Sequence, residues 1–285
     1  MSGQAIARRL ATTAPVNVRS ASLRAVYIIW YRDVLRFARD RIRLLVSFAQ
    51  PLLYLLIFGT GLSSTLGRGA GGFGAPGLKY QQFIFPGVIG MSVLFTSFIA
   101  GMSIVWDREF GFLKEVLVAP INRASVAVGK TLGSATQAMF QGLVILALAP
   151  VVGVHLTVVT VLQMIPLTFL LAFALSAVGV ALGARMRSLQ GFQMVMNFLM
   201  LPMFFLSGAL FPLQRLPAWL AVLTRLDPAA YGVDPLRRAA LGSVGDRLAL
   251  TVFGQALAVW TEQAVLIGFG LLMLTFAVRS FGRRD

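Results

Sequence analysis

The chain has 285 residues, of which 58% are hydrophobic and only 12% are charged, whereas soluble domains average about 45–50% and about 25%. A soluble globule of this size could not bury so much apolar surface, so the composition predicts a polytopic membrane protein and excludes a disordered chain or a coiled coil. The absence of cysteine and the single histidine exclude thiol catalysis, a disulfide scaffold and thiolate or multi-histidine metal centres. We therefore expect no metal site and no catalytic residues.

The basic excess predicts a membrane surface rather than nucleic acid. The 25 Lys and Arg against 10 Asp and Glu give a formal net charge of +15. Most of the arginines stand at the ends of apolar runs, where they orient spans and face anionic lipid headgroups. Basic grooves interleaved with aromatic residues, which nucleic-acid binding requires, do not occur outside the runs.

The first 43 residues contain two basic segments. Residues 1–22 have no acids, a composition that fits either a transit peptide or a cytoplasmic tail, and we favour the tail. Residues 23–43 have an apolar stripe and a basic stripe at helical spacing on opposite faces, which predicts an amphipathic helix in the membrane interface. The apolar stripe is Leu23, Tyr27, Trp30, Val34 and Phe37, and the basic stripe is Arg32, Arg36, Arg39 and Arg43.

Six apolar runs follow, each about 17–25 residues long, which suffices to cross a hydrocarbon core about 30 Å thick. They cover about 44–62, 83–105, 131–152, 159–184, 192–211 and a stretch within 256–278. The glycine-rich segment 67–77 predicts an external loop. Within the proline-containing region 212–250, residues 216–226 predict a short helix that dips into the outer leaflet or lies on it. A dipping element survives only where protein covers its backbone.

The basic residues also predict the orientation. If both termini lie inside, 18 of the 25 Lys and Arg fall in inside segments. The positive-inside rule therefore supports six spans with both ends in the cytoplasm. The domains we expect are a tail (1–22), an interfacial connecting helix (23–43) and a six-span transmembrane domain (44–285).

One short motif invites a nucleotide-site hypothesis. The segment ASVAVGKT (124–131) loosely matches a phosphate-binding loop. Only Gly129 supplies the glycine that such a loop needs, however, and no strand with a magnesium-binding acid follows. We favour the alternative that Lys130 anchors the end of the third span while Gly129 lets another helix approach closely.

Polar side chains within the runs are few. Glu262 is the single ionisable candidate, and Trp260 beside it indicates the outer interface, which weakens a proton-coupled carrier. Uncharged polar residues act either as hydrogen-bonding contacts between helices or as the lining of a weakly polar path for an amphiphile. These candidate path-lining residues are Gln50, Gln137, Gln141, Gln193 and Asn197.

The most informative segment is WDREFGFLKEVLVAPINRASVAVGK (106–130). It is cytoplasmic by the charge distribution and places acids and bases around an apolar set, with Gly111 breaking the pattern and Pro120 ending it. The residues alone leave two alternatives open, a docking surface for a soluble partner and a solvated loop.

Taken together, several segments resemble the membrane subunits of type-2 ATP-binding-cassette exporters, most closely the daunorubicin-type drug-efflux permeases. These are QPLLYLLIFGTGL (50–62), residues 80–130 beginning YQQFIFPG, FLSGALFPLQRLPAWL (205–220) and LDPAAYGVDPLRRAALG (226–242). The likeness covers about residues 23–280. Each piece alone is weak, and the combination is specific.

The resemblance implies an all-α membrane protein with six transmembrane helices, an N-terminal amphipathic interfacial helix, a cytoplasmic coupling helix and a short re-entrant outer region between spans five and six. It implies a homodimer paired through the first and fifth spans, with two copies of a separate cytoplasmic ATPase that binds the ATP and Mg. This chain itself would have no cofactor and no fused ATPase domain. The ATPase-coupling residues implied are Asp107, Arg108, Glu109, Phe110, Gly111, Leu113, Lys114 and Glu115.

The function expected from this likeness is a non-catalytic permease subunit in the inner or plasma membrane that exports a hydrophobic or amphiphilic compound, such as a drug or a lipid-like molecule. Alternatives are a lipid-linked polysaccharide exporter of the same family, a gradient-driven transporter without an ATPase, and a scaffold that transports nothing. Purified chain that moves substrate without ATP would favour the gradient-driven class. An ATPase whose hydrolysis responds to the chain would exclude the scaffold.

Overall fold

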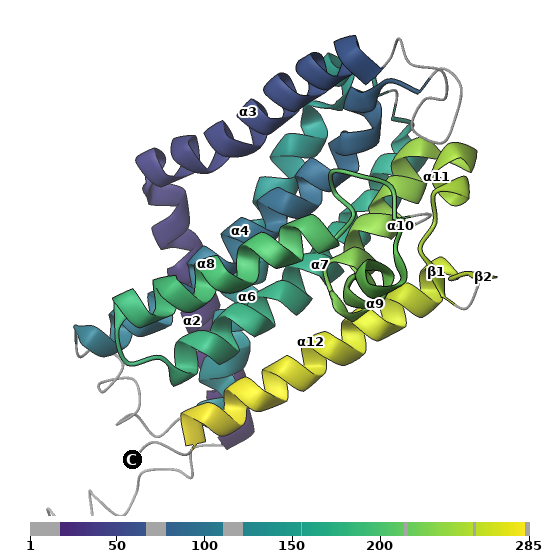
Figure 1. Ribbon diagram of the computed structural model, residues 1–285. Helices are drawn as coiled ribbons and strands as arrows, with labels where there is room; N and C mark the ends of the chain where they lie inside the picture. Colours follow the sequence, from purple (N-terminus) through teal and green to yellow (C-terminus); the bar gives the residue numbers. More distant parts are fainter. Residues whose placement is uncertain are drawn as a thin grey trace, which may run out of the picture.

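The computed structural model describes residues 18–66, 78–110, 122–154, 156–213, 216–252 and 255–282. Almost all of these residues are helical, and the long helices lie roughly along one direction as an elongated bundle (Figure 1). The long helices are α2 (Val18–Arg39), α3 (Arg41–Leu66), α4 (Tyr80–Glu109), α6 (Arg123–Ala147), α7 (Val158–Arg185), α8 (Leu189–Leu206) and α12 (Val259–Gly282).

Short elements complete the described fold. A 3₁₀ turn (Ala149–Val152) follows α6, and α9 (Ala218–Leu226), α10 (Ala230–Leu241) and α11 (Ser243–Arg247) connect α8 to α12. The two-residue strands β1 (Thr251–Val252) and β2 (Gln255–Ala256) pair antiparallel, with Thr251 opposite Ala256. The sequence predicted α9, whereas α10, α11 and the strand pair were not predicted.

Four of the described helices, α4, α7, α8 and α12, are long and apolar enough to cross a membrane. The pair α2–α3 adds a fifth span if it is taken as one broken element, bent by 72° near Asp40. The chain is therefore a multi-pass membrane protein with four to five candidate spans, and the count of six stays a prediction. Helix α6, which contains the predicted run 131–152, is not among these candidates. Its polar residues are enclosed by α2, α4, α7 and α12, so it does not need a continuous apolar surface.

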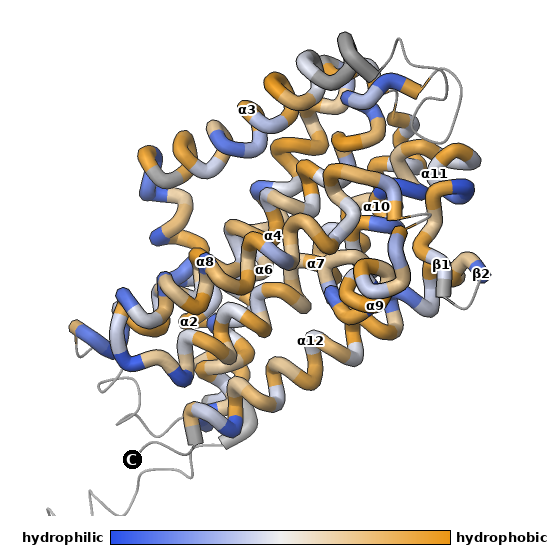
Figure 2. Tube along the Cα trace, viewed as in Figure 1, coloured by the Kyte–Doolittle hydropathy of each residue, from blue (hydrophilic) through white to orange (hydrophobic). Residues whose placement is uncertain are grey.

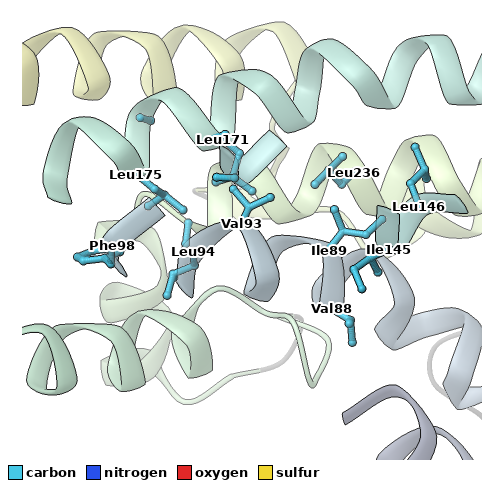
Figure 3. Close-up of a cluster of buried hydrophobic side chains, with 14 of the residues drawn as sticks. Val88, Ile89, Val93, Leu94, Phe98, Ile145, Leu146, Leu171, Leu175 and Leu236 are labelled. Atoms are coloured by element: carbon cyan, nitrogen blue, oxygen red, sulfur yellow. The ribbon is translucent and has the colours of Figure 1, made fainter. Parts of the chain in front are cut away.

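The core is centred on α4, which is buried along most of its length. Figure 3 shows Leu94 and Phe98 of α4 beside Leu175 of α7, and Ile89 beside Ile145 of α6; all five are fully buried or nearly so. Figure 2 shows that most residues along α3, α8 and α12 are apolar, and several large ones, such as Leu56, Phe198 and Leu272, are exposed. Such large exposed apolar faces are expected where lipid or another protein covers them.

Two helices at the centre of the bundle touch backbone to backbone. A Cβ atom on Gly101 of α4 would lie 2.6 Å from the backbone carbonyl carbon of Gly179 in α7, and one on Gly183 would lie 2.7 Å from the Gly101 carbonyl oxygen. Glycine at these positions lets α4 and α7 approach more closely than any larger residue would permit.

The two ends of the bundle differ (Figure 1). We call the end where α4, α7 and α12 finish and where α6 and α8 begin the basic end, and the end formed by α9, α10, α11 and the strand pair the cap end. At the cap end α10 is covered by α4, α7 and α12, and its residues 230–237 are buried apart from the half-buried Tyr231. The protein therefore covers the α10 backbone, which is the condition for a re-entrant element.

Candidate functional site

A buried lysine joins three helices at the basic end. Lys130 of α6 has a side chain that is 3% exposed, and its Nζ donates to Asp107 Oδ2 of α4 at 2.7 Å. The same ammonium lies 3.1 Å from Asp33 Oδ2 of α2 and donates to Ser103 Oγ at 3.3 Å. Three acceptors satisfy the three donors of an ammonium group, which allows the charge to be buried.

An arginine of α2 completes this group. Arg32 Nη2 lies 3.1 Å from both Asp33 Oδ1 and Asp107 Oδ2. Two cations and two carboxylates therefore balance, and we call Arg32, Asp33, Asp107 and Lys130 the charge cluster. Arg36 lies at its edge, with Nη1 3.8 Å from Asp107 Oδ1 and a largely exposed side chain. Since the cluster is mostly out of water, loss of one partner would leave another charge buried and unpaired.

Small residues of α6 bring α2 close enough to form the charge cluster. A Cβ on Gly129 would lie 3.0 Å from Ile29 Cβ, and one on Gly133 would lie 3.1 Å from Asp33 Cβ. The predicted close helix approach at Gly129 is thus confirmed. Trp30 Nε1 donates to Thr136 Oγ1 at 3.0 Å and fixes α2 against α6 one turn further along.

The position of α2 departs from the sequence expectation in one respect. The predicted helix was 23–43, whereas α2 ends at Arg39 and the chain bends there before α3 begins at Arg41. The tryptophan of the apolar stripe bonds to α6, while Leu23 and Tyr27 of the same stripe are exposed. Arg39 is exposed at the bend.

The end of α4 is also tied to α7. Arg108 donates to the Ala184 carbonyl at 2.8 Å and to the Met186 carbonyl, at the place where α7 ends. A cation at a helix C-terminus is favourable because unpaired carbonyls gather there. Glu109 and Phe110 are exposed, the latter at 81%. The other predicted coupling residues, Gly111, Leu113, Lys114 and Glu115, lie outside the described residues.

Further contacts tie α12 into the same end. Arg123, at the start of α6, donates to the Phe281 carbonyl at 3.2 Å. Arg185 of α7 donates to Ser280 Oγ at 3.4 Å and lies 4.0 Å above the Phe276 ring. The ends of α4, α6, α7 and α12 are therefore connected by arginine side chains.

A hollow of about 390 Å³ opens beside the charge cluster. Its described lining is Arg32, Arg36, Trp106, Asp107 and Phe110. Trp106 and Phe110 are exposed here next to two cations. Exposed aromatic and arginine side chains are the types enriched at the centres of protein interfaces, so the hollow is suited to binding a segment of protein.

The predicted path-lining residues separate into two groups. Gln137 Nε2 donates to the Asp33 carbonyl at 3.2 Å, and Gln141 Nε2 donates to the Ser47 carbonyl at 2.8 Å while its Oε1 accepts from Ser47 Oγ. Both side chains thus connect α6 to α2 or α3. Gln50 is exposed and lines a hollow of about 140 Å³ between α3 and α4, and Gln193 and Asn197 are exposed on α8.

The fold bears on two other kinds of site, a phosphate-binding loop and a metal site. The phosphate-loop hypothesis is wrong: residues 124–131 form the first turns of α6 rather than a loop, and the Ala124 and Ser125 amides already bond Asn122. Within the described ranges no group of three or more His, Cys, Asp and Glu residues is arranged to hold a metal ion.

The sequence matches the family model described as ABC-2 type transporter over residues 24–241. The chain belongs to the ABC-2 type transporter family. It is similar to the inner membrane transport permease YadH of Escherichia coli K12, with 28% identity over 261 residues that cover 90% of this chain and 97% of YadH. It is also similar to the transport permease ycf38 of Cyanophora paradoxa, with 27% identity over 75% of this chain and 73% of ycf38. Nodulation protein J of Rhizobium meliloti is 27% identical over 75% of this chain and 80% of its own length.

Membership makes the chain a transport permease, the membrane component of a transporter. Sequence reasoning found Asp107, Arg108 and Lys130 but did not pair them, and it missed Asp33. The sequence contains one signal for Asp33: it and Asp40 are the only acids before residue 107, and Asp33 alone lies within α2. A lone acid among arginines on a helix suggests a partner but does not say which residue it pairs with.

Proposed function

We propose that this permease is the membrane-spanning half of an ATP-driven exporter. Two copies of a separate cytoplasmic ATPase dock at the basic end, on the segment 106–117 and the hollow beside it. ATP binding and hydrolysis take place in those subunits, and the permease converts their movement into opening of a path. The cargo is a hydrophobic or amphiphilic compound.

The observation that supports this function is the charge cluster at the end of α4. Asp107 lies only four residues before Gly111, where the expected coupling segment continues, and it bonds Lys130 of α6 and Arg32 of α2. Arg108 bonds the end of α7. A force applied at Phe110 would therefore reach α2, α6 and α7 through short polar contacts rather than through flexible chain.

The arrangement in the membrane is part of the proposal. We place the basic end in the cytoplasm, since basic residues gather on that side, with six spans, both termini inside and the chain in the inner membrane. The likeness to YadH, whose name describes an inner membrane permease, agrees with this location. Two copies of the chain pair through α3 and α8, which lie together within one copy and leave large apolar residues such as Leu56 and Phe198 exposed.

Charge reversal at the coupling segment tests the function. The permease is reconstituted in liposomes with the ATPase that co-purifies with it, and uptake of a fluorescent hydrophobic amine is followed with and without ATP. We expect Glu109→Arg to lose at least about tenfold of the ATP-dependent transport, which corresponds to about 1.4 kcal/mol of coupling. Glu109 is exposed, so this variant should insert and fold normally.

The matched control is Asp246→Arg, a reversal of an exposed acid on α11 at the cap end. It should transport like the unmodified permease. Equal transport by both variants would contradict coupling through the end of α4. Transport by the permease alone down a gradient, without ATP, would instead support a gradient-driven carrier.

A further inference from the structure

Two buried carboxyl groups meet at the cap end, far from the charge cluster. Asp234 of α10 and Glu262 of α12 are both 0% exposed. The same atom, Arg238 Nη2, lies 2.8 Å from Asp234 Oδ2 and 3.0 Å from Glu262 Oε1. One guanidinium nitrogen therefore holds the two carboxyl groups next to each other. We call Asp234 and Glu262 the carboxyl pair.

The carboxyl pair lacks a hydrogen-bond donor. The described contacts satisfy one oxygen of each group: Asp234 Oδ2 accepts from Arg238 and from the Leu250 amide at 3.2 Å, and Glu262 Oε1 accepts from Arg238. Asp234 Oδ1 and Glu262 Oε2 are buried and have no partner among the described residues. An ionised carboxylate can only accept hydrogen bonds, so two such groups in contact leave two buried acceptors unsatisfied, which is strongly unfavourable.

None of the described residues around the carboxyl pair supplies the missing donor. The Tyr231 hydroxyl donates to the Arg225 carbonyl, and Arg238 Nη1 donates to the Leu257 carbonyl at 2.7 Å. Arg237 is fully buried, and its Nε and Nη1 have no described partner, but it bonds neither carboxyl: its Nη2 donates to the Gly208 carbonyl, and its guanidinium lies 4.5 Å above the Phe83 ring. Neither carboxyl lines the hollows of about 390 and 140 Å³ at the other parts of the bundle, where water could enter.

Other charged groups lie farther along the elements that pack against the carboxyl pair. The charged residues of α6 and α7 stand at the basic end, and α11 carries its acid and its arginine on exposed positions. The remaining titratable groups among the described residues of the cap end are Arg225, Asp227, Lys79 and Tyr80.

We propose that Asp234 and Glu262 share one proton, so that the cap end contains a proton-binding site that joins α10 to α12. A shared proton turns one of the two acceptors into a donor and makes a short, charge-assisted O–H···O bond. Two buried carboxyl groups that share one guanidinium nitrogen disfavour the state in which both are ionised. Arg238 then pairs with the single remaining negative charge. This inference does not depend on the ATPase or on the cargo.

The shared proton has a structural consequence. It favours the contact between α10 and α12, because the unprotonated pair would place two negative charges side by side against Arg238, the one guanidinium that bonds them. Loss of the proton at high pH should therefore loosen α10 from α12. The chain folds with this proton bound, whereas the unfolded chain releases it near the ordinary acid range, so the stability of the fold decreases as the pH rises.

Infrared spectroscopy of the purified full-length permease in detergent tests the proposal. A protonated carboxylic acid has a carbonyl stretching band that is separate from the carboxylate bands. We expect this band at pH 7 in the unmodified chain and expect one acid equivalent to disappear in Glu262→Gln, whose amide donates to Asp234 in place of the shared proton. Asp234→Asn should lose the same equivalent, and Asp246→Asn, which alters an exposed acid, should lose nothing.

A second measurement covers the case in which a variant does not fold. In an Asp227→Asn chain, which removes the other buried acid of the cap end, the same band should titrate away with rising pH together with a fall in the unfolding temperature. If the band in the folded protein at pH 7 is unchanged by Glu262→Gln and by Asp234→Asn, or if the Asp227→Asn chain has no such band, the shared proton is refuted.

Discussion

Lys130 can be buried because two carboxylates from different helices bind it. Its neighbours Asp33 and Asp107 lie 97 and 23 residues away in the sequence. We predict that Lys130→Met destabilises the fold by about 3 kcal/mol, at the lower end of the range for breaking a buried ion pair, because Arg32 still neutralises one of the acids. The unfolding temperature of the purified permease in detergent measures this change.

Two further variants make the test specific. Lys79→Met removes an exposed lysine at the start of α4 and should change stability by less than about 0.5 kcal/mol. Adding Asp107→Asn to Lys130→Met should recover part of the loss, since the double variant no longer buries an unpaired acid. A double variant that is as unstable as the sum of the two single variants would show that Lys130 and Asp107 do not interact.

Asp227 gives a pH-dependent prediction at the same scale. It lies between α9 and α10, where burial raises its pKa to about 8, although the hydrogen bond from the Ala229 amide opposes the shift. The unfolded value is about 4, so the folded chain holds a proton that the unfolded chain loses. The contribution of Asp227 to stability is therefore fully present below pH 4 and declines by up to about 1.4 kcal/mol per pH unit until about pH 8.

Asp227→Asn should remove this part of the decline, because the amide cannot ionise and its oxygen can still accept from Ala229. Unfolding temperatures at pH 5 and pH 8 would check it: the variant should lose less stability between the two values than the unmodified chain. The same decline in both proteins would mean that Asp227 is ionised in the fold.

Among the elements, α4 and α7 depend on glycine for their contact. Gly101→Ala would place its Cβ 2.6 Å from the Gly179 backbone, so the helices would have to separate. We expect a loss of about 1–3 kcal/mol, as for other overpacked positions. The control is Gly268→Ala on α12, where nothing lies within 4 Å of the added atom. That variant should be neutral or more stable by up to about 1 kcal/mol, as measured by thermal unfolding in detergent.

How far the elements could be predicted depends on what buries them. Helices α3, α4, α7, α8 and α12 were located by long apolar runs, because lipid or core covers them over most of their length. The start of α6 was missed, since Lys130 appeared to be an end anchor and only its distant partners allow it to lie inside the bundle. Helix α10 was missed for a similar reason. Pro235 and the charged residues around it suggest a loop, yet Arg238 forms ion pairs with both Asp234 and Glu262.

The site shows the same limit. The segment 106–110 was found because its charges follow an apolar run. The charge cluster was not found, because pairing α2 with α4 and α6 requires knowledge of the tertiary structure. Local signals such as Gly129 predicted that a helix would approach α6 but did not identify α2 as that helix.

At the scale of the whole molecule, the exposed apolar faces bear on assembly. Phe198 and Leu201 of α8 are 78% and 57% exposed, and Leu56 of α3 is 57% exposed. We predict that α8 faces a second copy. Since the chain has no cysteine, Phe198→Cys provides a single thiol, and oxidation in membranes should give a disulfide-linked dimer on a denaturing gel.

Leu272→Cys is the matched control for this prediction, because Leu272 of α12 is also exposed, at 58%. It should stay monomeric under the same oxidation. Dimers formed equally by both variants would indicate random collision in the membrane, and dimers formed only by Leu272→Cys would place the interface on α12.

The backbone contact between α4 and α7 limits how the protein can change shape. No side chains lie between the two helices at Gly101, Gly179 and Gly183, so they cannot slide or roll past each other without collision. We expect α4 and α7 to move together as one rigid unit. We expect transport to displace α3 and α8 relative to this unit, because their contacts are made by side chains such as Tyr54 and Phe204 rather than by backbone.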